Sequence, residues 1–475
     1  MATERAYTKI VASIGPASEG RIGELIDAGL SVARLNFSHG EHDEHRRRAE
    51  LIRKTAEERG VSIGLLGDVQ GPKLRLAHFV DGKLELGRGD VLRLSEGSGT
   101  ADPGEALFNF PGFLEAVTVG HRIFLADGVV ELRVVEDQGD HLLAKVTKGG
   151  WIGDRKGVAL PDSALAVELP TEKDRKDLEL ARELGLEFIG ASFVCDAADV
   201  RAIRSLAPES QIVAKIERAA AVENIDEILR EADGIMVARG DLGVETALEG
   251  LPMLQKSLLA KASAAGRFTI TATEMLESMV EVPRPTRAEA ADVANAVLDG
   301  TDAVMLSAET AVGAWPVEAV RTMGRIARSV EQSPVYQRRP KAPFREMEPD
   351  FSNAIARAAV LVSEALSIRT IVCFTESGNT ARLLSRYRPN AVVHAFSPHQ
   401  ATQTAMSVLA HVVAHPFLRA TSLEEMLWEA SRRLLDLGVA SFGDEVVFVA
   451  GVPPGISRTT NVMKLHRVGE PVRLS

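Results

Sequence analysis

The sequence has few cysteines and no long apolar stretch. Only two of its 475 residues are cysteine, Cys195 and Cys373, which is too few for the disulfide framework of a secreted domain and favours a reducing compartment. No apolar run approaches the roughly 20 residues of a membrane-spanning helix. The N-terminal residues also lack the basic-then-apolar pattern of a signal peptide. We therefore predict a soluble, cytoplasmic protein that does not bind a membrane.

An excess of positive charge is also absent. The chain has 55 lysines and arginines against 66 acidic residues, a net charge of −11, which argues against a dedicated nucleic-acid-binding protein. No Gly-x-x-x-x-Gly-Lys-Ser/Thr loop occurs, so an ordinary P-loop nucleotide site is excluded, and no histidine pair has zinc-like spacing with a cysteine. A hydrophobic fraction of 45% is enough for a large core, and the length is typical of roughly three domains.

Short apolar runs alternate with longer amphipathic stretches, which is the pattern of parallel βα units. Eight such runs are expected to be strands, at residues 10–14, 32–37, 62–67, 188–193, 212–216, 234–238, 268–272 and 303–306. Helices are expected between them, at residues 41–58, 199–206, 222–231 and 285–298. This pattern predicts a (β/α)₈ barrel, although the strand count alone leaves an open doubly wound sheet possible.

Two further segments interrupt or follow the barrel pattern. After the third run, short alternating segments separated by Asp-Gly and Gly-Asp turns predict an inserted antiparallel β domain, on the barrel face where insertions form lids. Late in the chain, a segment rich in proline and basic residues is typical of a linker. We predict an α/β protein with a barrel domain at 1–72 and 158–335, a β lid domain at 73–157, a linker at 336–349 and a C-terminal α/β domain at 350–475.

Polar residues follow nearly every expected barrel strand. The carboxyl ends of barrel strands form the face on which barrel enzymes hold their sites. Any one of these residues could be a helix cap or a surface charge, but their recurrence predicts an active site. They are Arg34, Asn36, Ser38 and His39 after the second run, Asp68 after the third, Lys215 and Glu217 after the fifth, Arg239 and Asp241 after the sixth, Thr273 and Glu274 after the seventh, and Ser307 and Glu309 after the eighth.

The types of these residues favour phosphate chemistry. Lys215 and Glu217 are two positions apart on a strand, so their side chains point the same way. The carboxylates of Glu217 and Asp241 are hard ligands suited to Mg²⁺ or Mn²⁺, and two carboxylates leave room for substrate oxygens. Arg34, Arg75 and Lys215 can bind phosphoryl oxygens and stabilise developing charge. The residues therefore predict metal-assisted phosphoryl or enolate chemistry.

Long segments of the sequence resemble the pyruvate kinase family. They are residues 8–16 (TKIVASIGP), 33–40 (ARLNFSHG), 71–74 (GPKL), 214–217 (AKIE), 233–243 (DGIMVARGDLG), 275–279 (MLESM) and 283–300 (PRPTRAEAADVANAVLDG). The resemblance covers essentially the whole chain in order. It implies transfer of the phosphoryl group of phosphoenolpyruvate to ADP, giving pyruvate and ATP, and it implies a homotetramer.

The resemblance also implies a role for each matching residue. Lys215 would neutralise the transferring phosphoryl group and the enolate oxygen, and Arg34 would bind phosphate. Glu217 and Asp241 would hold Mg²⁺ or Mn²⁺, and a second divalent ion would arrive with the nucleotide. The remaining assignments are Gly240 and Asp241 at the substrate carboxylate, Thr273 near the carbon that is protonated, and Arg75, Lys156, Asn36 and His39 at the nucleotide.

One departure from the family pattern concerns a monovalent cation. Many members need K⁺, held by groups matching Asn36, Ser38, Asp68 and the Val69 carbonyl, and in those members a glutamate commonly follows the Gly-Pro. Here that residue is Lys73. An ammonium near the cation position would supply the same charge, so we count Lys73 among the catalytic residues and expect a K⁺-independent enzyme. The alternative is that Lys73 is a solvated surface lysine.

A second departure is Glu274, which stands where the family usually has glutamine. It adds a carboxylate near the region of proton delivery and leaves the proton donor unassigned.

The C-terminal domain contains a candidate regulatory loop. It consists of Thr375, Ser377, Gly378, Asn379 and Thr380, between an expected strand and helix. The loop resembles the family's effector-phosphate loop, and its hydroxyls and helix N-terminus suit a phosphorylated regulator. An ordinary helix cap would have the same sequence.

Two other functions are compatible with a barrel of this kind. A metal-dependent lyase acting on a phosphoenolpyruvate- or pyruvate-like substrate would also use Glu217 and Asp241, but it would leave Arg75 and Lys156 unexplained. A non-catalytic relative would be expected to lack Lys215, Glu217 or Asp241, and all three are present.

Overall fold

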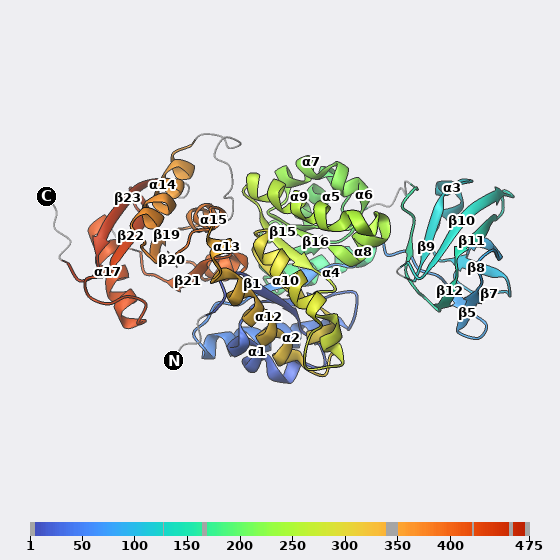
Figure 1. Ribbon diagram of the computed structural model, residues 1–475, viewed down its shortest axis with the longest axis horizontal. Coiled ribbons are helices and arrows are strands. Elements are labelled where there is room, and N and C mark those ends of the chain that lie inside the picture. The colour runs from blue at the N-terminus through green and yellow to red at the C-terminus, as the bar shows by residue number, and fades with distance from the viewer. Residues whose placement is uncertain are drawn as a thin grey trace.

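A computed structural model describes residues 5–126, 128–163, 169–338, 350–419, 422–455 and 459–470. The barrel lies in the middle of the molecule, with the inserted β segment at one end and the C-terminal α/β unit at the other (Figure 1). Most of the expected linker, residues 339–349, falls outside the described part of the chain. Within the described residues, no helix has both the length and the apolar character that a membrane crossing requires.

Among the described residues, eight parallel strands close into a barrel in the order β1-β18-β17-β16-β15-β14-β3-β2. They are β1 (Lys9–Ser13), β2 (Leu30–Asn36), β3 (Gly64–Asp68), β14 (Phe188–Ala191), β15 (Gln211–Ile216), β16 (Gly234–Ala238), β17 (Phe268–Ala272) and β18 (Ala303–Leu306). The first and last strands pair in parallel, with Lys9 opposite Ala303. This closure confirms the barrel and excludes the open sheet, since an open sheet leaves its edge strands unpaired.

Helices cover the outside of the barrel. They are α1 (Ile22–Ala28), α2 (His42–Glu58), α4 (Glu172–Glu183), α5 (Ala197–Leu206), α6 (Ala219–Glu223), α7 (Ile225–Glu231), α8 (Arg239–Glu245), α9 (Leu251–Ala264), α10 (Arg287–Leu298), α11 (Ala308–Ala311), α12 (Pro316–Glu331) and α13 (Pro334–Gln337). The prediction of a single helix at 222–231 is wrong at its N-terminal end. The chain breaks into α6 and α7 at Asn224, whose side-chain amide donates to the Cys195 carbonyl at 3.0 Å.

The inserted segment forms sheets with a hydrophobic core of their own. Its elements are β4 (His78–Phe79), β5 (Lys83–Leu86), β6 (Val91–Glu96), β7 (Thr100–Ala101), β8 (Glu105–Phe108), α3 (Phe113–Ala116), β9 (Arg122–Leu125), β10 (Val130–Asp137), β11 (Leu142–Lys148), β12 (Gly150–Gly153) and β13 (Val158–Ala159). Its largest sheet has the order β13-β9-β10-β11-β6-β8. Leu94, Ile123, Leu132 and Val146 are buried together inside it. A separate core lets this unit sit beside the barrel mouth without belonging to the barrel.

The C-terminal unit is a layered α/β sheet. Its strands are β19 (Thr370–Phe374), β20 (Val392–Ser397), β21 (Val412–Pro416), β22 (Glu445–Gly451) and β23 (Thr460–Arg467), and its helices are α14 (Phe351–Ala365), α15 (Asn379–Arg386), α16 (Gln400–Ala405) and α17 (Leu423–Asp436). The order is β21-β20-β19-β22-β23, and β23 runs antiparallel to β22. Strand β21 was not expected from the sequence.

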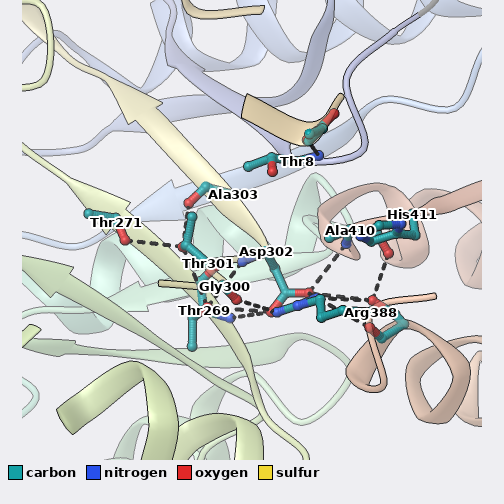
Figure 2. Close-up of polar contacts among 12 residues, drawn as sticks. Thr8, Thr269, Thr271, Gly300, Thr301, Asp302, Ala303, Arg388, Ala410 and His411 are labelled. Atoms are coloured by element: carbon teal, nitrogen blue, oxygen red, sulfur yellow. Dashed lines mark hydrogen bonds and ion pairs between the residues drawn. The ribbon is translucent and has the colours of Figure 1, made fainter. Parts of the chain in front are cut away.

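A buried ion pair joins the base of the barrel to the C-terminal unit (Figure 2). Asp302, just before β18, accepts hydrogen bonds from Arg388, at 2.5 Å to Oδ1 and 2.8 Å to Oδ2. The backbone N–H groups of Thr269, at 3.0 Å, and Ala410, at 3.3 Å, also donate to this carboxylate. Both carboxylate oxygens are therefore supplied with donors, which is the condition for burying a charge without a large penalty.

Candidate active site

The polar residues that follow the barrel strands meet at one mouth of the barrel. Arg34 on β2 contacts Asp68 at the end of β3, with 2.7 Å between Nε and Oδ2. The Lys215 ammonium on β15 lies 3.2 Å from the other oxygen of Asp68 and 2.8 Å from Glu217. The fold thus brings four of the residues singled out from the sequence into one continuous chain of ion pairs.

The centre of this chain is charged although it is buried. Burial alone would raise the pKa of Asp68, but the adjacent Lys215 and Arg34 hold it below its ordinary value. Burial would lower the pKa of Lys215, but Asp68 and Glu217 raise it above the ordinary lysine value. Lys215 is therefore an ammonium at neutral pH, and Asp68 fixes its position.

Glu217 and Asp241 form the acidic side of the site. Burial raises the pKa of Glu217; Lys215 opposes this rise, and the nearby Asp241 carboxylate adds to it. Both acids line one pocket. Glu217 accepts the Phe193 N–H at 2.8 Å, whereas no described residue donates a hydrogen bond to the Asp241 carboxylate. Lys215 balances only part of the negative charge of these two close carboxylates, and their oxygens fit the hard-ligand preference of Mg²⁺ or Mn²⁺.

Two neighbours of this acidic group were missed by sequence reasoning. The Lys215 ammonium donates to the Ser192 hydroxyl at 2.6 Å, and this hydroxyl donates to the Val69 carbonyl at 2.7 Å. Phe193, which holds Glu217 through its N–H, has a left-handed backbone with φ of 59°. The strand expected at 188–193 ends at Ala191 in β14, so Ser192 lies just after the strand, where the sequence analysis had considered no polar residue.

Cationic side chains surround His39 at the rim of the mouth. Burial lowers the pKa of His39, and the positive charges of Arg75, Lys73 and Arg34 lower it further. Arg75 is anchored through a 3.0 Å hydrogen bond to the Arg155 carbonyl. This group of cations suits an anionic ligand with several phosphates.

Lys73 and Lys156, the two other lysines expected at the site, lie in different places. Lys73 lines the same pocket as Glu217 and Asp241. Both lysines are exposed; the Lys156 side chain runs beside Gly153 on the inserted segment. The static structure therefore places Lys73 within the mouth and Lys156 outside the pocket that Lys73 lines.

Protein donors contact three of the four groups that match a monovalent cation site, namely the Asn36 side chain, Asp68 and the Val69 carbonyl. The Ser38 N–H donates to the Asn36 side-chain oxygen at 3.1 Å, and the Val69 carbonyl accepts the Ser192 hydroxyl. Asp68 forms ion pairs with Arg34 and Lys215. The ammonium against this turn belongs to Lys173, on α4, which donates to the Phe37 carbonyl at 2.5 Å. Sequence reasoning placed only Lys73 near this position and missed Lys173.

The loop after β17 carries Thr273. Its hydroxyl accepts the Gly240 N–H at 2.8 Å and donates to the Ala272 carbonyl at 2.7 Å. The side chain of Glu274 is exposed. After β18, the buried Glu309 accepts the N–H groups of Leu276, at 3.1 Å, and Ser307, at 2.7 Å. Glu309 therefore braces two adjacent loops of the mouth through their backbones.

The expected regulatory loop lines a cavity of about 310 Å³ in the C-terminal unit. Gly378 has φ of 81° and donates its N–H to the Thr375 hydroxyl at 2.9 Å, and the Thr380 and Thr460 hydroxyls are 2.7 Å apart. Glu376 also faces this cavity. Burial would raise its pKa, but hydrogen bonds from Arg419 and His399 hold it below the ordinary value.

These contacts define what the mouth can do chemically. A fixed ammonium, a fixed guanidinium and two carboxylates with a cation preference face one another, and further cations lie across the opening. Such a set can bind a phosphorylated acid, stabilise negative charge as a phosphoryl group leaves, and stabilise the resulting enolate.

Comparison with known proteins agrees with this geometry. The family model described as "Pyruvate kinase, barrel domain" matches residues 5–320, and "Pyruvate kinase, alpha/beta domain" matches residues 353–466. Proteins named pyruvate kinase from Bacillus licheniformis and Geobacillus stearothermophilus are 43% and 42% identical over 98% of this chain, covering 81% and 80% of their own lengths. A pyruvate kinase from Clostridium perfringens is 37% identical over 97% of this chain and 99% of its own length.

Proposed function

Because this chain belongs to the pyruvate kinase family, we propose that it transfers the phosphoryl group of phosphoenolpyruvate to ADP, giving pyruvate and ATP. The observation that carries this proposal is the chain of ion pairs through Arg34, Asp68, Lys215 and Glu217, beside Asp241. A phosphoryl transfer between two anions needs fixed positive charge more than it needs a nucleophilic side chain.

The proposed roles of the basic residues follow from their positions. Arg34 binds the phosphate of phosphoenolpyruvate. Lys215 lies where negative charge develops on the enolate oxygen as the bond between phosphorus and that oxygen breaks. Since Asp68 contacts both cations, they are held in place before substrate binds, and little reorganisation is required during the reaction.

Glu217 and Asp241 would hold Mg²⁺ or Mn²⁺. The bound cation supplies positive charge to oxygens of the two anionic substrates. Arg75, with Asn36 and His39 beside it, is proposed to meet the nucleotide phosphates. Lys156, on residues 73–157, would reach them only if this segment moves toward the barrel as a lid.

We also propose that the enzyme does not require K⁺. The support is that three of the four groups matching the K⁺ ligands already accept donors of the protein. Two ammonium groups also lie at this rim, on Lys73 and on Lys173, which is paired with Asp177. Their charge substitutes for that of the ion.

The C-terminal domain is proposed to bind a phosphorylated regulator in its cavity. Thr375, Ser377, Asn379 and Thr380 line this cavity and supply hydroxyl or N–H donors, and Gly378 supports the loop by donating its N–H to the Thr375 hydroxyl. The charge of Glu376, which would repel a phosphate, is offset by Arg419 and His399. We further propose that the chain assembles as a homotetramer. Measurement of its molecular mass in solution tests this proposal.

The central experiment supplies phosphoenolpyruvate, ADP and Mg²⁺ to the purified protein and follows pyruvate and ATP together. We expect the two products in equal amounts. Tetramethylammonium replaces K⁺ in a parallel assay, where we expect the rate to change less than about twofold. Pyruvate without ATP would show a phosphatase or lyase and would overturn the proposed function, whereas a large stimulation by K⁺ would overturn only the K⁺ proposal.

A further inference from the structure

Arg239 connects two loops of the barrel mouth and has no role in the chemistry described above. It begins α8 directly after β16, yet its buried side chain reaches the loop that follows β17. One guanidinium nitrogen donates to the Thr273 carbonyl at 2.7 Å, and Nε donates to the Ala272 carbonyl at 3.3 Å. On its other side the guanidinium forms a 2.7 Å ion pair with Asp292 on α10.

The loop that Arg239 contacts has an unusual backbone. Thr273 has φ of 66° and Glu274 has φ of 54°, so two consecutive residues other than glycine adopt the left-handed conformation. L-amino acids rarely adopt this conformation, and it persists only where surrounding contacts impose it. The carbonyls before and after the first left-handed residue, those of Ala272 and Thr273, are the two that Arg239 binds. Arg239 is therefore placed to impose this conformation.

The same contacts fix the Thr273 side chain. The Ala272 carbonyl accepts both from Arg239 and from the Thr273 hydroxyl, and that hydroxyl accepts the Gly240 N–H. Gly240 follows Arg239 in the chain. The Arg239 side chain thus holds the Thr273 loop, while its backbone leads directly into Gly240. Arg239 therefore sets the distance between Thr273 and Gly240.

We propose that Arg239 is a positioning residue for the proton-transfer half of the reaction. It acts through Thr273, which the family resemblance assigns to the neighbourhood of the carbon to be protonated. In this step the methylene carbon of the enolate forms a bond to a proton taken from solvent, and the enolate oxygen becomes a carbonyl oxygen. This inference rests on the proposed function. It adds a residue, Arg239, that serves the protonation step and not phosphoryl transfer.

A purely structural role is the competing explanation, since Arg239 and Asp292 also tie α8 to α10. The two explanations differ in what a conservative variant loses. R239K keeps the positive charge beside Asp292, but its single ammonium nitrogen does not reproduce the planar fork with which three guanidinium nitrogens contact the Ala272 carbonyl, the Thr273 carbonyl and Asp292. D292N keeps the guanidinium on both carbonyls and removes the ionic anchor.

The test separates protonation from phosphoryl transfer in the full-length enzyme with Mg²⁺. Steady-state assays give kcat and the KM values for phosphoenolpyruvate and ADP. Exchange of the methyl hydrogens of pyruvate in deuterated water, followed by NMR, reports proton transfer at the carbon alone. R204K is the matched control, because Arg204 also joins a carbonyl, of Glu231, and a carboxylate, of Asp233, each at 2.7 Å, on the outer side of the barrel.

For R239K we expect methyl exchange to slow by about tenfold to a hundredfold, as small displacements of reacting groups commonly do, with the KM for ADP within about twofold of wild type. D292N should slow exchange by about two- to fivefold, and R204K should not change it. Unchanged exchange in folded R239K would overturn the inference, as would an equal loss in every parameter. If R239K does not fold, unchanged exchange in D292N overturns it. A wild-type enzyme without turnover would instead overturn the proposed function.

Discussion

The two ends of the barrel bury carboxylates in opposite ways. At the base, Asp302 meets Arg388 and two backbone N–H groups, so each of its oxygens has donors. At the mouth, Glu217 is packed near a second acid, Asp241, and burial raises its pKa. The base is electrostatically complete, whereas the mouth is complete only when a cation and an anionic substrate are added.

This difference explains why similar residues have different consequences at the two ends. Asp302 and Arg388 balance each other's charge at the junction of the barrel and the C-terminal unit, so this pair needs no ligand. An acidic pair without enough partners is unfavourable in the free protein, and ligand binding relieves it. Left-handed backbone does not follow this division, since it occurs at Phe193, Thr273 and Glu274 in the mouth and at Arg388 and His411 at the base.

The largest effect is expected from removing the central ammonium of the mouth. In K215M, we expect kcat to fall by about 10³-fold, because charge on the enolate oxygen loses its fixed partner. The measurement is formation of pyruvate and ATP at saturating substrates. K261M is the control, since Lys261 pairs with Asp226 on the exposed surface of the barrel, and it should match wild type. A K215M enzyme within tenfold of wild type would remove Lys215 from the mechanism.

At the base, the corresponding change should affect stability and leave the chemistry intact. R388M leaves Asp302 as a buried charge without its counter-ion, and we expect a loss of about 3–5 kcal/mol in the free energy of unfolding. Urea denaturation measures this loss, and R201M, which breaks the exposed pair with Glu231, is the control. The kcat of folded R388M should stay within about threefold of wild type. A stable R388M with a large loss of kcat would erase the distinction between the two ends.

The sequence predicts those features of the two ends that depend on neighbouring residues in the chain. The strands at 234–238, 268–272 and 303–306 are correct to the residue, because polar residues bound each apolar run. The polar groups at their ends could be named for the same reason. Strand β21 was missed, since its five residues include an exposed valine and a proline and show no clear alternation.

Contacts between distant segments could not be predicted. Lys173 reaches the Phe37 carbonyl across 136 positions of sequence, and Arg388 reaches Asp302 across 86. No periodicity of the chain encodes such a pair, since each depends on how complete elements dock. The double contact of Arg239 with the Thr273 loop is of this kind as well, although Arg239 itself had been noted at the end of its strand.

Acid should weaken the side of the C-terminal unit that faces the base of the barrel. His394 and His415 are 2.9 Å apart there; burial, assisted by nearby positive charge, lowers the pKa of His394 to about 3 and that of His415 to about 4. The unfolded chain takes up these protons near pH 6.5. Stability is therefore fully present above pH 6.5 and falls as the pH drops toward 4, by about 2 kcal/mol between pH 6.5 and 5 for His415.

Urea denaturation at a series of pH values measures this acid loss. The H415Q variant keeps a group that can hydrogen-bond to His394 but cannot take up a proton, so the slope of its unfolding free energy against pH should be smaller between pH 6.5 and 5. An identical slope in H415Q and wild type would assign the acid sensitivity to other groups.

The smallest effect is expected from a variant that places a carboxylate at position 73, where many family members have a glutamate. Lys73 lines the pocket of Glu217 and Asp241, so K73E replaces a positive charge with a third negative charge beside these two acids. We expect activity in tetramethylammonium buffer to fall by about tenfold, a loss of about 1.4 kcal/mol in transition-state stabilisation, and K⁺ to restore part of it. K73Q and K173Q separate the two ammonium groups at this rim, and the larger loss identifies the one that replaces the ion. If all three variants match wild type without K⁺, Lys73 is a solvated lysine, and the mouth compensates its negative charge through Arg34 and Lys215 alone.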